Sequence, residues 1–182
     1  MKAYVDVHDK RWNKYKIYFE KIVNMVVGAK YKNAEASIIL TNDTEIHEIN
    51  RNYRNMDKPT NVLSFELGDD ILLGDIFISL DTVRREAKMA NISVDEHTAH
   101  MVVHGVLHLL GYDHLDDKQA KKMEAKEVKA LAKIGIKNPY EDAGVCCACE
   151  CEKNCPGAGV VSFVRRLKVR EDSWVQYALY AV

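Results

Sequence analysis

The feature that most constrains this chain is a histidine motif at residues 104 to 114, which reads H-x-x-x-H-x-x-G-x-x-H. On a helix, residues i and i+4 share a face one turn apart, so His104 and His108 are spaced to meet one metal ion. Gly111 accepts the left-handed backbone that ends many helices, and the chain then returns His114 to the same ion. Three imidazole ligands with an open fourth position are typical of a catalytic zinc site, so the motif predicts one bound zinc ion.

Two further histidines, His97 and His100, lie on the same stripe of the predicted helix. His100 and His108 would be about 12 Å apart along the helix axis, so they cannot share an ion. Because His114 follows the C-terminal end of the helix, the pair that it can join is His104 and His108. We interpret His100 as a packing residue or a partner of a ligand, and His97 as a core histidine.

Gly105 distinguishes this motif from the histidine motifs of metallopeptidases. In H-E-x-x-H metallopeptidases, the residue after the first histidine is a glutamate that acts as general base. Glycine inside a helix costs about 1 kcal/mol relative to alanine, so its presence calls for a reason. Either the substrate or a neighbouring element approaches the backbone closely, or the glycine reflects simple tight packing. In both cases the nucleophile must come from water activated by the metal, or from a group that the motif does not contain.

Composition and charge narrow the class of protein. A length of 182 residues fits one domain with a sizeable core. The net charge of −1 gives no global basic field, so any contact with nucleic acid must come from a local patch. The N-terminus is polar and charged, and the apolar runs are short and interrupted by histidine. We therefore expect a cytoplasmic protein with no membrane segment.

Hydrophobic periodicity predicts four strands and five helices. The predicted strands cover residues 3–7, 34–40, 62–67 and 73–79, and the predicted helices cover 11–27, 43–53, 81–90, 94–110 and 116–134. We expect Gly28 to cap the first helix, Pro59 to stop the second, and Asp81 to cap the third. The alternating charges of the last helix are interpreted as a solvated face. This order predicts an α+β fold in which a single four-stranded mixed sheet is covered by about five helices, with the metal site at the end of a buried helix.

Several stretches of the chain strongly resemble the YbeY family. The histidine motif is similar to its signature H-G-x-L-H-L-x-G-Y-D-H, and residues 53–54 with 57–65 are similar to its central segment. Residues 73–76 with 78–79 are similar to its next strand. The resemblance covers about residues 1–142 and implies the same α+β fold. It also implies a single-strand-specific, zinc-dependent endoribonuclease that acts in ribosomal RNA processing and in ribosome maturation or quality control, with ribosomal RNA and ribosomal particles as partners.

The resemblance places a functional arginine at Arg54, and we predict that Arg54 and His114 are catalytic residues. Phosphodiester chemistry needs a cation for the charge on the phosphoryl oxygens, which agrees with an arginine there. Arg51 and Lys58 would extend this patch, although a solvated helix face explains the two arginines as well. Asp75 and Asp113 are candidates to orient a ligand imidazole, or are simple cap or turn residues.

Two other functions compete with the ribonuclease. One is another zinc hydrolase, such as a peptidase whose base comes from elsewhere in the chain. The other is a ribosome-assembly binding factor whose zinc is structural, which the open fourth coordination position disfavours.

The C-terminal segment differs from the rest of the chain. Composition shifts after Tyr140, and five cysteines crowd into ten residues, at positions 146, 147, 149, 151 and 155. Cys146 and Cys149 match C-x-x-C, but no well-spaced second pair follows, which disfavours a zinc or iron–sulfur site. We therefore divide the chain into a catalytic domain at 1–142 and a cysteine-rich tail at 143–182. The tail is either a lineage-specific extension or, as we favour, the product of a shifted or read-through reading frame.

Overall fold

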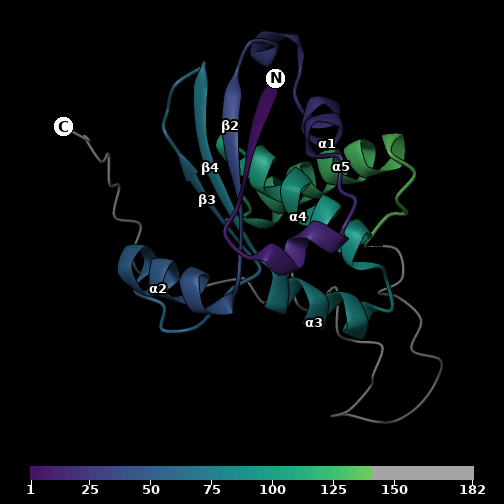
Figure 1. Cartoon of the computed structure of the whole chain (residues 1–182). Coiled ribbons are helices and arrows are strands. Elements are labelled where there is room, and N and C mark those ends of the chain that lie inside the picture. The colour runs from purple at the N-terminus through teal and green to yellow at the C-terminus, as the bar shows by residue number, and fades with distance from the viewer. Residues whose placement is uncertain (141–182) are drawn as a thin grey trace.

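The computed structural model describes residues 1–140, and a four-stranded mixed sheet forms one layer of the molecule (Figure 1). The strands are β1 (Lys2–Val7), β2 (Glu35–Thr41), β3 (Val62–Glu66) and β4 (Leu72–Ser79). They are ordered β1-β2-β4-β3, with β1 parallel to β2, β2 parallel to β4, and β3 antiparallel to β4. All four predicted strands are confirmed, and the last two form an antiparallel hairpin.

Alternation along the strands gives the sheet two different faces. Ile38 of β2 pairs with Ile76 of β4, and both are fully buried on the face that carries the core. The neighbouring residues Asp75 and Phe77 point to the opposite face, because successive side chains of a strand alternate. The hydrophobic core therefore lies on one side of the sheet.

Helices cover that core, and α4 lies at its centre (Figure 1). The α-helices are α1 (Phe19–Val26), α2 (Asp43–Arg54), α3 (Leu80–Ala90), α4 (Val94–Leu109) and α5 (Asp117–Lys133). Two short 3-10 helices are η1 (Lys10–Lys14) and η2 (Ala29–Tyr31). Helix α4 contacts β3, β4, α1, α3 and α5, which explains why it is apolar on almost every side. The predicted α+β class and the buried histidine helix are confirmed.

Both ends of α4 are set by the sequence. The Ser93 hydroxyl accepts a hydrogen bond from the Glu96 backbone N–H, and the Glu96 carboxylate accepts one from the Ser93 N–H. This capping box pairs two backbone donors that the helix leaves free. At the other end, Gly111 has a φ of 77°, which turns the chain back toward the helix. The start and the end of the histidine helix are thus as predicted.

The single helix predicted over residues 11–27 is wrong. The chain forms η1 and α1, separated by extended backbone that begins at Tyr15. Trp12 is buried, and its indole N–H donates to the Thr41 carbonyl at 2.9 Å, which anchors η1 beside the end of β2. The helix α1 then ends at Val26 with an extended Val27, so Gly28 is not the cap. A tertiary contact of Trp12 has overridden the local helical period.

Two predicted helix boundaries also need correction. Helix α2 ends at Arg54 because Asn55 takes a left-handed conformation with a φ of 53°, so Pro59 does not stop it. Helix α3 begins after Ser79, so Asp81 is a residue of its first turn and not its cap. The cap of α2 is Asn42, whose side-chain oxygen accepts hydrogen bonds from the N–H groups of Thr44 and Glu45.

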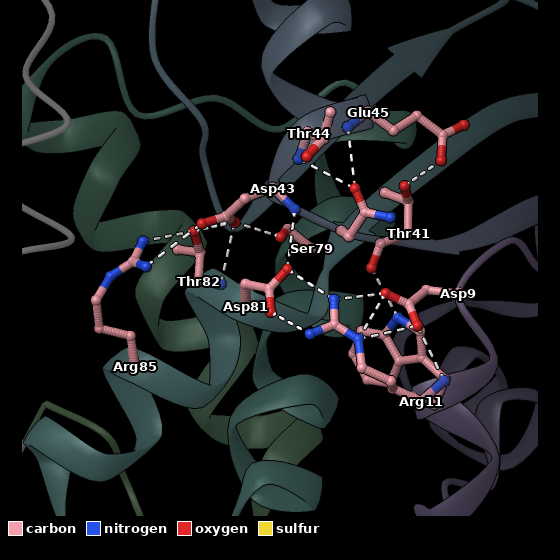
Figure 2. A network of polar contacts seen from close by, with 12 residues as sticks. Asp9, Arg11, Thr41, Asp43, Thr44, Glu45, Ser79, Asp81, Thr82 and Arg85 are labelled. Atoms are coloured by element: carbon pink, nitrogen blue, oxygen red, sulfur yellow. Dashed lines mark hydrogen bonds and ion pairs between the residues drawn. The ribbon is translucent and has the colours of Figure 1, made fainter.

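A polar network joins the starts of α2 and α3 to η1 (Figure 2). Arg11 donates to both Asp9 and Asp81, while Arg85 lies 3.3 Å from Asp43. The network ties α2 to the rest of the fold at its N-terminal end. Its C-terminal end is tied by Tyr53, whose ring contacts Phe65 of the edge strand β3 at 5.4 Å.

Within residues 1–140, no helix is both long enough and apolar enough to cross a membrane. The tail and its five cysteines, together with the predicted domain boundary at residue 142, lie outside the described residues.

Candidate metal centre

Three histidine side chains converge where α4 ends. His104 and His108 come from the last two turns of the helix, and His114 arrives from the segment after Gly111. One ring nitrogen from each lies within 4.8 Å of the others, and the Nε2 atoms of His104 and His108 are 3.0 Å apart. Ligand nitrogens of a tetrahedral zinc site would be about 3.3 Å apart at ordinary Zn–N distances. The predicted triad is therefore brought together by the fold.

The surroundings favour the neutral form of His108 and His114. Burial, together with the neighbouring His104 and His114, lowers the pKa of His108 to about 3. Burial, together with His104, also lowers the pKa of His114. A neutral imidazole offers a lone pair, which is the form that binds a metal ion. His104 is buried while His108 and His114 are partly exposed, so the cluster is reachable from one side.

A buried carboxylate lies behind the cluster. Oε1 of Glu127, on α5, lies 2.7 Å from Nδ1 of His104. Its Oε2 accepts a hydrogen bond from the Tyr140 hydroxyl and lies 3.4 Å from Nε2 of His100. Burial raises the pKa of Glu127, but the hydrogen bonds from His100 and His104 outweigh it, so the net pKa lies well below its ordinary value.

The sequence did not lead us to predict a role for Glu127 in the site, because we interpreted the charged residues of α5 as a solvated face. That assignment is wrong for this residue, which is 1% exposed. A signal was present in the sequence. Glu127 lies four residues after Met123 and four before Leu131, so it occupies the apolar stripe of the helix, and both neighbours are buried. A lone carboxylate on an apolar stripe indicates a buried partner.

The reason for Gly105 is the sheet. A Cβ atom at this position would lie 2.9 Å from Cγ2 of Ile76 and 3.0 Å from Oγ of Ser64. Strands β3 and β4 thus approach the helix backbone closely. The two explanations for the glycine, close approach of a neighbouring element and tight packing, therefore describe the same contact. Gly105 also leaves the motif without the carboxylate base of metallopeptidases.

Arg54 borders the cluster from the end of α2. Its side chain is exposed, burial of part of the guanidinium lowers its pKa, and the nearby Asp113 raises it. Arg54 in turn lowers the pKa of His108, so the two side chains are close enough to interact. Arg51 and Lys58 are also exposed, but neither makes a hydrogen bond or an ion pair with the histidine cluster. Arg54 makes no such bond to the cluster within the described residues either, so its electrostatic effect on His108 is what favours it over these two as a site residue.

The remaining candidates have structural roles. Asp113 accepts a hydrogen bond from the His114 backbone N–H at 2.7 Å, which is a turn contact. Asp75 lies on the sheet face opposite Ile76 and α4, so it cannot orient a ligand imidazole. His97 is buried against Glu86 at 2.7 Å and is a core histidine, as predicted. His100 contacts Glu127, which matches its predicted role as the partner of a ligand or a packing residue.

Comparisons with known proteins agree with this arrangement. Residues 4–135 match the family model described as Endoribonuclease YbeY. The chain is 50% identical over 121 residues to the endoribonuclease YbeY of Sphingopyxis alaskensis, covering 59% of this chain and 72% of the relative. It is 42% identical over 139 residues to that of Ruthia magnifica, covering 74% of this chain and 95% of the relative. The solution structure of TM1509 from Thermotoga maritima shares the fold, with a TM-score of 0.51 and 24% identity over 81% of this chain and 100% of that one.

Proposed function

The chain belongs to the YbeY family of endoribonucleases, and we propose that it is a zinc-dependent enzyme that cleaves single-stranded ribosomal RNA in the cytoplasm. Its role would be in ribosomal RNA processing and in ribosome maturation or quality control, with ribosomal particles as partners. The family supports the ribonuclease class of the reaction. The observation that carries the zinc proposal is the convergence of three histidine side chains at one point, with one ring nitrogen of each within 4.8 Å of the others.

The donor set fits zinc. Imidazole nitrogens suit zinc among the common biological metals, although copper, iron and nickel accept them too. Three protein ligands leave one coordination position for a water or a substrate oxygen, as in catalytic zinc sites. When bound there, zinc would supply Lewis-acid chemistry, which polarises a phosphoryl oxygen and lowers the pKa of a water molecule.

The protein side chains contribute binding and charge. Arg54 would hold a phosphate through its planar guanidinium and offset negative charge that develops on the phosphoryl oxygens. His114 would have two roles. It would be the metal ligand that follows the turn at Gly111, and its partly exposed ring would border the bound substrate. His104 is held from behind by Glu127, so it cannot swing away when substrate enters.

One assay separates this proposal from its rivals. Zinc-loaded protein is incubated with ribosomal RNA and, in parallel, with casein, each with and without a chelator. We expect RNA cleavage that the chelator abolishes, and intact casein. A peptidase would give the reverse pattern, whereas an assembly factor with structural zinc would cleave neither substrate. A single-stranded oligoribonucleotide and its duplex, compared under the same conditions, test the strand preference.

The His108→Ala variant is the control for the metal. It removes one ligand, so elemental analysis should show the loss of about one zinc per chain together with the loss of cleavage. Stoichiometric zinc in this variant would remove His108 from the centre. Cleavage by a zinc-free variant would reveal a contaminating nuclease and leave the proposal without support.

A further inference from the structure

We propose that Glu127 is the positioning residue of the metal centre, and that Tyr140 and His100 hold its carboxylate in place. The inference rests on the zinc centre proposed above and extends it to residues outside the histidine motif. Tyr140 lies beyond residues 4–135, the part of the chain that matches the family model.

The first step is the tautomer of His104. A neutral imidazole has one N–H and one lone pair, and a carboxylate can only accept a hydrogen bond. With Oε1 of Glu127 at 2.7 Å from Nδ1, that nitrogen must carry the proton. The lone pair is then on Nε2, the atom that lies 3.0 Å from Nε2 of His108. Glu127 thereby directs the metal-binding nitrogen of His104 toward the other ligands.

The second step is the asymmetry of the cluster. In the part of the chain that the structure describes, His104 is the ligand whose second ring nitrogen meets a carboxylate. The carboxylate of Asp113 bonds to the backbone of His114, not to its ring. His104 is also the buried ligand, whereas the other two are partly exposed. Of the three residues that would hold the metal, His104 is therefore the one fixed most firmly, by a contact from α5.

The third step concerns the contacts that hold the Glu127 carboxylate in place. A buried carboxylate is expensive to desolvate and is tolerated only when its oxygens are well paired. Tyr140 donates to Oε2, and the His100 ring lies 3.4 Å from the same atom. The His100 and Tyr140 rings also contact each other edge to face at 5.9 Å. The segment after α5 thus closes over the carboxylate that holds His104.

Zinc affinity tests the inference without any RNA. Chelator competition measures the zinc affinity of the full chain, and the visible spectrum of the Co²⁺-substituted protein reports the ligand geometry. We expect Glu127→Gln to bind zinc about 10-fold more weakly, since the amide can still accept but carries no charge, and Glu127→Leu about 100-fold more weakly. Tyr140→Phe should cause a smaller, few-fold loss. The Co²⁺ spectrum should change in both Glu127 variants, which a merely structural role would not cause.

Asp95→Asn is the control, because it also removes a carboxylate charge, and Asp95 is an exposed first-turn residue of α4, the helix that carries His104. It should leave zinc affinity unchanged. If Glu127→Leu does not fold, Glu127→Gln decides the question. Wild-type zinc affinity and an unchanged Co²⁺ spectrum in Glu127→Gln would overturn the inference. Its failure is separable from that of the metal centre, because only retention of zinc by His108→Ala would remove the centre itself.

Discussion

Asp43 and Asp81 each accept a backbone hydrogen bond from the first turn of the other residue's helix (Figure 2). The Asp43 carboxylate accepts from the Thr82 N–H of α3 at 3.1 Å, and the Asp81 carboxylate accepts from the Asp43 N–H of α2 at 3.3 Å. The N-terminus of a helix carries free N–H groups and a partial positive charge, so a carboxylate stabilises it. This reciprocal arrangement fixes the direction of α2, whose far end carries Arg54.

Loss of the Asp43 carboxylate should destabilise the protein. Asp43 also accepts from the hydroxyls of Ser79 and Thr82, and both of those residues are buried. Asp43→Ala leaves these donors without their acceptor, so we expect the free energy of unfolding to fall by about 1–3 kcal/mol. Urea unfolding measures the change. Asp95→Ala, which removes an exposed first-turn carboxylate of α4, is the control and should cost only a few tenths of a kcal/mol. Equal losses in the two variants would contradict the role of Asp43.

Stability conferred by Asp81 should depend on pH. The hydrogen bond from Arg11 lowers the pKa of Asp81 below its ordinary value of 3.8. A carboxylate with a lowered pKa in the folded state stabilises the protein fully above the unfolded pKa, and this contribution is lost as the pH falls through the folded pKa. The wild type should therefore be more stable than Asp81→Asn at pH 7 and pH 5, and the difference should shrink below pH 4. Unfolding midpoints at pH 7, 5 and 3 provide the measurement, and a gap that stays constant to pH 3 would contradict the prediction.

A methyl group at position 105 should push the helix away from the sheet. Gly105→Ala places a Cβ against Ile76 and Ser64 at distances that ordinary packing does not allow. We expect a loss of about 1–3 kcal/mol in stability, despite the better helix propensity of alanine. Ser64→Ala removes one of the two obstructing side chains, so the double variant should lose less than the sum of the single changes.

Gly28→Ala is the matched control for position 105, since the same change meets open space there. Thermal unfolding of the wild type and the four variants provides the comparison. A Gly105→Ala protein as stable as Gly28→Ala would mean that the sheet does not require the glycine.

The histidine triad was predictable because it depends on local geometry alone. An i, i+4 pair and a glycine turn fix three side chains within eleven residues, whatever the rest of the fold does. The strands were predictable for a similar reason, since alternation is also a local pattern. The helix expected over residues 11–27 failed because Trp12 finds its partner, Thr41, on another element. No local pattern contains that contact.

Glu127 shows the same difference, between local patterns and contacts that only the fold creates, within the site. It lies 23 residues from His104, and only the packing of α5 against α4 brings the two together. Charged residues on a helix are normally solvated, so a position on the apolar stripe was the single sign of a different role. Arg54 stands between the two cases. A family resemblance predicted its position, while its electrostatic effect on His108 depends on where α2 ends in the fold.

Removal of residues 143–182 should leave folding and zinc content unchanged. All the described helices and strands, the histidine cluster and Tyr140 precede residue 143. Circular dichroism and elemental analysis of the truncated protein test this. A shorter truncation product that ends at residue 135 should fold but bind zinc more weakly, because it lacks Tyr140. An insoluble protein after removal of 143–182 would show that the tail belongs to the domain.

Arg54 provides the sharpest test of the proposed reaction. Arg54→Ala should reduce RNA cleavage by at least about tenfold, since loss of one charge-assisted contact to phosphate costs about 1.5–3 kcal/mol. Zinc content and melting temperature should stay nearly unchanged, because the side chain is exposed and its loss opens no cavity. Arg54→Lys should restore activity only in part, since an ammonium is a point charge and cannot bind two phosphate oxygens through a planar group.

Arg84→Ala, which removes an exposed arginine of α3, is the control and should cleave RNA like the wild type. Full cleavage by Arg54→Ala would exclude Arg54 from the reaction and leave the metal centre without its predicted phosphate-binding cation.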